Sequence, residues 1–307
     1  MEIFNIVQIA FSIILLWKGA ELLIDNSVKV AYSLNISPLV IGLTVVAFGT
    51  SAPEFAVTIN AAISGQSDIS VSNVIGSNIF NLGFILGGIA IIKSIKTDRI
   101  LVYRDGTVLM ATTIVILFFF WDLTFTRFEG LILFLGLILY IIFLFTQKDN
   151  RGIGIKFASA RTRDILFLLL GITAVVVGGY ILKIGAIALA QDLGLSEWII
   201  GVTIIAAGTS APELVTSLIA VIKGQHGISI GNLIGSDLFN LLGVLGLAGI
   251  ISPLTVSSNA IGSLAMLVGM VVLVVFFLRT GWILSRTEGT ILVLINLLRW
   301  TMDFATQ

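Results

Sequence analysis

The chain of 307 residues contains no cysteine, one histidine and four prolines, and only 11% of its residues are charged. The lack of cysteine excludes disulfides, thiol chemistry and cysteine-ligated zinc. Lysine plus arginine and aspartate plus glutamate number 17 each, so no net charge points to nucleic acid or to an acidic partner. About a quarter of the residues of a soluble domain are charged. This chain therefore lacks the polar surface that such a domain presents to water.

Apolar residues take the place of the missing charge. They make up 57% of the chain, and the mean hydropathy is +1.11. Ten runs are long enough to cross about 30 Å of hydrocarbon, which predicts an all-α membrane protein of ten transmembrane helices in contact with the lipid bilayer. The predicted spans are residues 3–24, 38–64, 69–93, 103–121, 128–146, 164–190, 197–222, 227–251, 259–278 and 286–302. The first run lacks a basic start and is too long for a signal-peptide core, so we expect a retained span.

The orientation of the spans follows from the positions of lysine and arginine. Thirteen of these residues lie in the linkers after the first, third, fifth, seventh and ninth spans, and two, Arg127 and Arg299, lie on the opposite side. Linkers rich in lysine and arginine face the cytoplasm. We therefore expect both termini to be extracellular and the protein to reside in the cell membrane.

The sequence contains an internal duplication. Residues 42–83, the first copy, align without a gap on residues 201–242, the second copy, at an offset of 159, with 22 of 42 positions identical. Each half has five predicted spans, an odd number, so the second half must enter the membrane from the opposite face. Inverted repeats of this kind are typical of secondary transporters. We predict a first five-helix repeat over 1–147, a cytoplasmic linker over 148–163 and a second, inverted repeat over 164–307.

A hexapeptide, G-T-S-A-P-E, occurs in both copies, at 49–54 and 208–213. Proline has no N–H to donate and its ring clashes with the carbonyl four residues earlier, so we expect broken helices at Pro53 and Pro212. Each break is predicted to leave backbone carbonyls around 47–50 and 206–209 without helical partners. Inside a bilayer, such carbonyls must face protein, water or a bound ion. A packing kink explains the prolines equally well.

The glutamates of the hexapeptide, Glu54 and Glu213, are harder to explain by packing. A carboxylate at the centre of a membrane helix costs about 2.5–3.5 kcal/mol on insertion scales. Its compensating partner is a proton, a residue of another helix or a metal cation. A protonated glutamate that only donates a hydrogen bond is the structural alternative.

Helical spacing places further oxygen ligands near these glutamates. Residues three or four apart share a helix face, and the duplicated set is Thr50, Ser51, Ser77 and Asn81 with Thr209, Ser210, Ser236 and Asn240. Carboxylate, carbonyl, hydroxyl and amide oxygens suit hard cations such as Ca²⁺ and Na⁺. Asp237 lies about 100° round the helix from Ser236, so we expect it beside the site or facing water.

The two hexapeptides, each followed by G-S-N-I-F-N (76–81) or G-S-D-L-F-N (235–240), resemble the alpha repeats of the sodium/calcium exchanger family. The resemblance covers nearly the whole chain. It implies alternating-access exchange of Na⁺ for Ca²⁺, with Glu54 and Glu213 shared by both ions and the Ser and Thr hydroxyls as sodium ligands. It also implies that backbone carbonyls near Ala47 and Ala206 complete the sites. No organic cofactor and no enzymatic activity are implied, and the short linker leaves no room for a large regulatory domain.

Asn81 and Asn240 depart from the pattern, because several relatives have aspartate at one of these positions. The predicted cage then holds two carboxylates, so the coupling ratio stays open. Two alternatives to Na⁺/Ca²⁺ exchange also stay open, an H⁺/Ca²⁺ antiporter and a passive cation channel. A channel is usually a ring of subunits around an axis, whereas a single chain of inverted halves favours a transporter that functions as a monomer.

Overall fold

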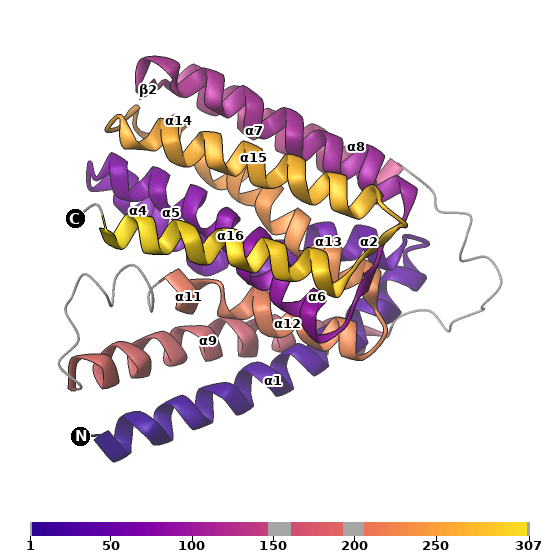
Figure 1. Cartoon of the computed structure of the whole chain (residues 1–307). Helices are drawn as coiled ribbons and strands as arrows, with labels where there is room; N and C mark the ends of the chain where they lie inside the picture. The colour runs from indigo at the N-terminus through magenta and orange to yellow at the C-terminus, as the bar shows by residue number, and fades with distance from the viewer. Residues whose placement is uncertain (1, 147–160, 193–205, 306–307) are drawn as a thin grey trace. The chain divides into compact units, whose positions relative to one another are not determined.

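The computed structural model describes residues 2–146, 161–192 and 206–305, which are helical over most of their length (Figure 1). Among these residues, seven helices are long and apolar enough to cross a membrane: Phe4–Ser33, Ser67–Ile92, Leu101–Asp122, Arg127–Thr146, Thr162–Gln191, His226–Ile251 and Asn259–Arg279. An eighth candidate is the bent pair Pro38–Thr50 and Ala52–Ile63. These eight correspond to eight of the ten predicted spans.

The other two predicted spans are not among these candidates. Only the second half of the predicted span 197–222 belongs to the described residues, as two short helices. The predicted span 286–302 is helical, but it carries Arg286, Glu288 and Arg299 and is less apolar than the seven candidates. Most of the predicted linker 148–163 lies outside the described residues. The ten-span inverted repeat therefore stays a prediction.

The chain divides into two compact units, and each is described by itself. Unit 1 comprises Met1–Pro53 and Ile142–Asn232. Its elements are α1 (Glu2–Ser33), α2 (Pro38–Ile41), the π-helical segment η1 (Gly42–Val46), α3 (Ala47–Thr50), α9 (Thr162–Asp192), α11 (Ala206–Thr209), α12 (Ala211–Ile222) and the first half of α13 (His226–Leu238).

The two long helices of unit 1, α1 and α9, pack against each other along their length and run antiparallel (Figure 1). Glycines allow a close approach between them: a β-carbon on Gly178 would lie 2.9 Å from the Leu16 side chain, and one on Gly171 would lie 2.6 Å from the Leu23 backbone nitrogen. Small residues are the common means of bringing membrane helices together.

Unit 2 comprises Glu54–Ile141 and Leu233–Gln307. Its helices are α4 (Ala52–Ile63, from Glu54 on), α5 (Ser67–Phe80), α6 (Gly87–Ile92), α7 (Thr107–Phe119), α8 (Arg127–Thr146, up to Ile141), the end of α13, α14 (Leu245–Ile251), α15 (Asn259–Arg279) and α16 (Arg286–Ala305). The π-helical segments η2 (Asn81–Leu86), η3 (Leu101–Gly106) and η7 (Phe239–Val244) and the short 3₁₀ turn η4 (Phe120–Asp122) join them.

Unit 2 also contains four two-residue strands that pair in a symmetrical way. The strands are β1 (Ile95–Lys96), β2 (Thr124–Phe125), β3 (Leu254–Thr255) and β4 (Ile283–Leu284). β1 pairs antiparallel with β4, and β2 with β3. The repeat offset of 159, added to Ile95 and subtracted from its partner Leu284, gives Leu254 and Phe125, which are partners in the other pair. This exchange of partners is what a two-fold relation between the repeats requires.

Two glycine contacts in unit 2 follow the same relation. A β-carbon on Gly289 would lie 2.6 Å from the Gly87 carbonyl oxygen, where α16 meets α6. A β-carbon on Gly130 would lie 2.6 Å from the Gly246 carbonyl oxygen, where α8 meets α14. The pairs are again related by the offset of 159. The duplication is thus preserved in packing as well as in sequence, and it supports the predicted repeat.

Both hexapeptides interrupt a helix, although not at the proline itself. The first break lies at Ser51, between α3 and α4, where the helix pair bends by 53°. The second lies at Ser210, between α11 and α12. Pro212 occupies the first turn of α12, where a missing N–H costs nothing. The prediction of broken helices is confirmed for the first copy by the bend, but each break precedes its proline by two residues because proline begins the following helix.

Candidate functional site

The two hexapeptides contribute to one buried polar cluster in unit 1. Ser51 Oγ donates a hydrogen bond to Glu213 Oε1 at 3.1 Å. Thr50 Oγ1 lies 3.0 Å from Asn232 Oδ1. These four side chains are almost completely shielded from solvent. The hydrogen bond from Ser51 therefore orients the carboxyl group of Glu213.

The break at Ser51 explains how α3 delivers two hydroxyls to this cluster. Ser51 leaves the helical conformation, with φ −79° and ψ 7°, while its backbone N–H still donates to the Ala47 carbonyl at 3.0 Å. Thr50 Oγ1 lies 3.3 Å from the same carbonyl. The prediction that the break leaves this carbonyl without a helical partner is wrong for Ala47. A carbonyl oxygen has two lone pairs, and the single hydroxyl proton of Thr50 can go to Asn232 Oδ1 instead, which leaves one lone pair of Ala47 for a cation.

The second copy supplies the remaining predicted residues of unit 1. Thr209 and Ser210 are buried at the break between α11 and α12, and Glu213 lies in the first turn of α12. The N-terminal end of a helix favours negative charge, because its first N–H groups are unpaired along the helix. Ala206 is the first residue of α11.

In unit 2, Glu54 is fully buried near the start of α4. Asn73 of α5 reaches across to α4: its Nδ2 donates to the Glu54 backbone carbonyl at 3.3 Å and to Thr58 Oγ1 at 2.9 Å. Ser77, one turn further along α5, is buried and donates to the Val74 carbonyl at 3.1 Å. Asn73 thus ties the turn that carries Glu54 to the helix that carries Ser77.

The same arrangement recurs in unit 1. Asn232 Nδ2 donates to Ser217 Oγ at 2.9 Å, and these residues are the offset equivalents of Asn73 and Thr58. The duplication marks Asn73 and Asn232 as repeated positions, but nothing in the sequence says that each asparagine braces the helix that carries a glutamate. These four residues are the supporting contacts that the sequence did not reveal.

The predicted amide residues Asn81 and Asn240 come together with a carboxylate in unit 2. Asn81 Nδ2 donates to Asp237 Oδ1 at 3.1 Å, and Asn240 Nδ2 donates to Asn78 Oδ1 at 3.3 Å. All four side chains are fully buried, as is Ser236. Of the two positions expected for Asp237, beside the site or facing water, the second is wrong, because its side chain is fully buried.

Two π-helical segments coincide with these amides. η2 begins at Asn81, and η7 begins at Phe239, one residue before Asn240. π-helical turns are rare and often occur at functional sites, since the wider turn changes the direction in which a side chain points. The pattern of apolar residues predicts neither segment.

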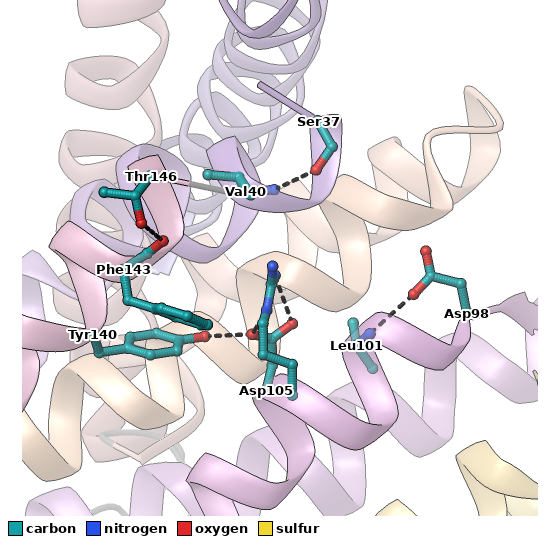
Figure 2. Close-up of polar contacts among 9 residues, drawn as sticks. Ser37, Val40, Asp98, Leu101, Asp105, Tyr140, Phe143 and Thr146 are labelled. Carbon is teal, nitrogen blue, oxygen red and sulfur yellow. Dashed lines mark hydrogen bonds and ion pairs between the residues drawn. The ribbon is translucent and has the colours of Figure 1, made fainter. Parts of the chain in front are cut away.

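A second buried polar group in unit 2 is structural in character (Figure 2). The Arg104 guanidinium donates to both carboxylate oxygens of Asp105, at 2.8 and 3.1 Å, and the Tyr140 hydroxyl donates to Asp105 Oδ1 at 2.8 Å. Figure 2 shows the Tyr140 side chain directed at Asp105, and near it Asp98 accepting a hydrogen bond from the Leu101 N–H. A carboxylate that an arginine neutralises has no need of a bound cation.

The chemistry of the clusters is all-oxygen. Within the described part of the chain, no group of three or more histidine, cysteine, aspartate or glutamate side chains is placed to hold a metal. Hydroxyl, amide, carbonyl and single carboxylate oxygens are instead available in each unit, which suits exchangeable hard cations better than a tightly held transition metal. The structure brings Thr50, Ser51 and Glu213 together in unit 1, and Asn81 and Asn240 into one cluster in unit 2.

Comparison with known proteins gives consistent matches over nearly the whole chain. The family model described as sodium/calcium exchanger protein matches residues 4–146 and 164–298. CaxA of Alkalimonas amylolytica is 34% identical over 296 residues, which cover 92% of each protein. The sodium/calcium exchanger MaX1 of Methanosarcina acetivorans is 29% identical over 335 aligned positions, 94% of this chain and 95% of the relative. A structure of the sodium-calcium exchanger NCX_Mj soaked with Na⁺ and Ca²⁺ has a TM-score of 0.87 at 30% identity and covers 98% of this chain and 99% of its own.

Proposed function

This chain belongs to the sodium/calcium exchanger family, and from that premise we propose that it exchanges Na⁺ for Ca²⁺ across the cell membrane by alternating access. Family membership makes it a transmembrane cation/Ca²⁺ antiporter, a transporter rather than an enzyme. The choice of Na⁺ as the driving ion, the ligands and the topology belong to the proposal.

The hydrogen bond between Ser51 and Glu213 carries the proposal. A hydroxyl from the first hexapeptide and the carboxylate of the second meet in a buried position, so the two copies act on the same group. A duplicated scaffold with a purely structural role has no need of a buried carboxylate, whose insertion is costly. A cation that binds and leaves gives that carboxylate a function.

We assign ion binding to both glutamates, Glu54 and Glu213, as ligands of Ca²⁺ and of Na⁺. The further oxygen ligands are those that the repeat supplies twice: Thr50, Ser51, Ser77 and Asn81 with Thr209, Ser210, Ser236 and Asn240, and the carbonyls of Ala47 and Ala206. The burial of the eight polar side chains and the all-oxygen chemistry support this set. The net negative charge of two carboxylates matches one Ca²⁺ or two Na⁺, which is the condition for exchange at shared ligands.

The topology is part of the same proposal. Ten spans in two inverted repeats, 1–147 and 164–307 with a cytoplasmic linker 148–163 between them, place both termini outside the cell. The symmetrical pairing of the short strands in unit 2 supports this arrangement. We also propose that one chain in the lipid bilayer is sufficient for transport, with no organic cofactor.

Transport into proteoliposomes tests the proposal. Purified protein is reconstituted, and Ca²⁺ uptake is followed with an outward gradient of Na⁺, of K⁺ or of H⁺, each applied alone. We expect uptake with the Na⁺ gradient only. Uptake driven by H⁺ alone identifies an H⁺/Ca²⁺ antiporter instead. Ca²⁺ uptake that persists without any counter-ion gradient identifies a passive channel, since a channel needs no exchange partner.

A further inference from the structure

The two copies of the repeat differ at a buried position next to the asparagine ligands. Asn78 of the first copy corresponds to Asp237 of the second, so only the second copy has a carboxylate there. Asp237 is fully buried and is the twelfth of the 26 residues of the candidate span His226–Ile251, far from either end. Burying a carboxylate at that depth costs free energy, and such residues usually have a function.

Two amide side chains bond to Asp237 within unit 2, and a third amide bonds to one of these two. Asn81 Nδ2 donates to Asp237 Oδ1 at 3.1 Å. Asn78 Nδ2 donates to the backbone carbonyl of Asp237 at 3.3 Å, and Asn78 Oδ1 in turn accepts from Asn240 Nδ2 at 3.3 Å. Amides are neutral, so these bonds hold the carboxylate in place without cancelling its charge.

Two of these amides have an oxygen atom without a hydrogen-bond donor in the described part of the chain. Among the hydrogen bonds of the described residues, none reaches Oδ1 of Asn81 or Oδ1 of Asn240, and both side chains are fully buried. Buried polar atoms nearly always have a partner, and an exception calls for an explanation such as an ion. One carboxylate and two amide oxygens in one buried cluster offer hard oxygen ligands to a cation.

We propose that Asp237 binds a sodium ion together with the amide oxygens of Asn81 and Asn240, as a third carboxylate of the transport machinery besides Glu54 and Glu213. The choice of Na⁺ among monovalent cations rests on the proposed function. A single carboxylate matches one positive charge, whereas sites for Ca²⁺ usually combine several carboxylates with other oxygens.

The amide of Asn81 explains how the cluster can work with and without the ion. A 180° rotation of the side-chain amide group puts its oxygen where its nitrogen was, at nearly the same place. Turned one way, Asn81 gives Asp237 a hydrogen-bond donor. Turned the other way, it gives the ion a second oxygen next to the carboxylate. The Asn81 side chain can therefore serve the carboxylate when the ion is absent and the ion when it is bound.

Asp105 provides a matched comparison in the same unit. It is also a fully buried aspartate, but Arg104 and Tyr140 donate to it (Figure 2). The guanidinium already supplies its positive charge. The hydrogen bonds described above for Asp237 come from neutral amides, so Asp105 serves as the control for a buried aspartate that an arginine already neutralises.

Sodium binding to purified protein in detergent tests the inference, with ²²Na⁺ equilibrium dialysis as the readout. Asp237→Asn gives the second copy the residue that the first copy already has, so we expect it to fold. It should bind one Na⁺ fewer per chain than the parent protein, and Asp105→Asn should bind the same number as the parent. An unchanged sodium count in Asp237→Asn would overturn the inference.

A second set of variants keeps the inference separate from the proposed function. In the double variant Glu54→Gln/Glu213→Gln, Na⁺ should still raise the melting temperature, and adding Asp237→Asn should abolish that rise. If the parent protein fails to exchange Na⁺ for Ca²⁺ but these sodium effects appear, the proposed function fails and the Asp237 site stands. If exchange occurs and the triple variant responds to Na⁺ like the double variant, the Asp237 site fails alone.

Discussion

Ser51 Oγ lies 3.1 Å from Glu213 Oε1, and the two residues are 162 positions apart in the chain. Each belongs to one copy of the same hexapeptide, so neither copy forms its polar cluster alone. The contact joins α12 to the break that follows α3. A change in the charge of Glu213 therefore acts directly on a residue of the first copy. The Ser51 hydroxyl can respond because it accepts hydrogen bonds as well as donating them.

Glu54→Gln and Glu213→Gln should each abolish Na⁺-driven Ca²⁺ flux without unfolding the protein. Glutamine has nearly the same shape but no charge, so it removes a cation ligand and also the cost of burying a carboxylate, about 2.5–3.5 kcal/mol on insertion scales. Flux into proteoliposomes and the melting temperature in detergent are the measurements. Glu129→Gln changes a partly exposed glutamate that accepts from the Thr126 N–H at the start of α8, and this variant should transport normally. Near-normal flux in either buried variant would remove that glutamate from the site.

Ser51→Ala should weaken Ca²⁺ binding about tenfold. The variant loses a hydrogen bond to a charged group, worth about 1.5–3 kcal/mol, and tenfold in affinity corresponds to about 1.4 kcal/mol. Calorimetric titration with Ca²⁺ measures the effect. Ser72→Ala is the matched control, since Ser72 is exposed and bonds only to the carbonyl of Ile69 within its own helix. Equal affinities for the two variants would mean that the hydroxyl of Ser51 neither binds the ion nor orients Glu213.

The parts of this structure that the sequence predicts are those decided by local composition and by the duplication. Apolar length alone places the candidate spans, and the hexapeptides locate the buried glutamates, since proline and glutamate are both expensive in a membrane helix. The offset of 159 also relates contacts that are far apart in the chain, such as the two strand pairs of unit 2.

What the sequence does not predict depends on packing between helices. The breaks fall at Ser51 and Ser210 because a proline fits the first turn of the next helix better than the break itself. The π-helical turn at Asn81 is a choice between two hydrogen-bond registers of similar energy, which neighbouring helices decide. A helical wheel places Asp237 on a different side of its helix from Ser236, but it cannot show that Asn81, at the start of η2, lies on that other side.

Calcium affinity should weaken as the pH falls. Carboxylates must be deprotonated to bind a metal, so protons compete with Ca²⁺ for Glu54 and Glu213. Where both glutamates take up protons, linkage predicts a loss of about 100-fold in affinity per pH unit, and about tenfold if only one of them does. Calcium titrations between neutral and mildly acidic pH measure the slope. An affinity that stays constant over this range would contradict binding by two carboxylates.

Gly171→Ala should destabilise the protein by about 1–3 kcal/mol, the usual cost of overpacking. A β-carbon there would lie 2.6 Å from the backbone nitrogen of Leu23, and backbone atoms cannot rotate away, so α1 and α9 would have to separate. Gly269→Ala in α15 is the control, because nothing lies within 4 Å of its added β-carbon. It should be neutral or stabilising, by roughly 0.5–1 kcal/mol. Thermal unfolding in one detergent compares the two variants. Equal melting temperatures would contradict the close packing of α1 against α9.

Asn240→Asp tests whether the ligand set of the second copy extends beyond Glu213. The parent amide donates to Asn78 Oδ1 at 3.3 Å; a carboxylate cannot donate there, and it adds negative charge three residues from Asp237. We expect the variant to gain pH dependence and a changed dependence on Na⁺, because the new carboxylate binds either a proton or a cation. Calcium affinity should change by no more than a few-fold, since the two glutamates still dominate it.

The control is Asn60→Asp, which adds the same charge at an exposed position of α4. It should leave the dependence on pH and on Na⁺ unchanged. The measurement is Ca²⁺ flux against pH and Na⁺ concentration for the parent and both variants in the same liposomes. Superimposed curves for the parent and Asn240→Asp would place residue 240 outside the ion site, and the amide oxygens would then have to be removed from the proposed ligands.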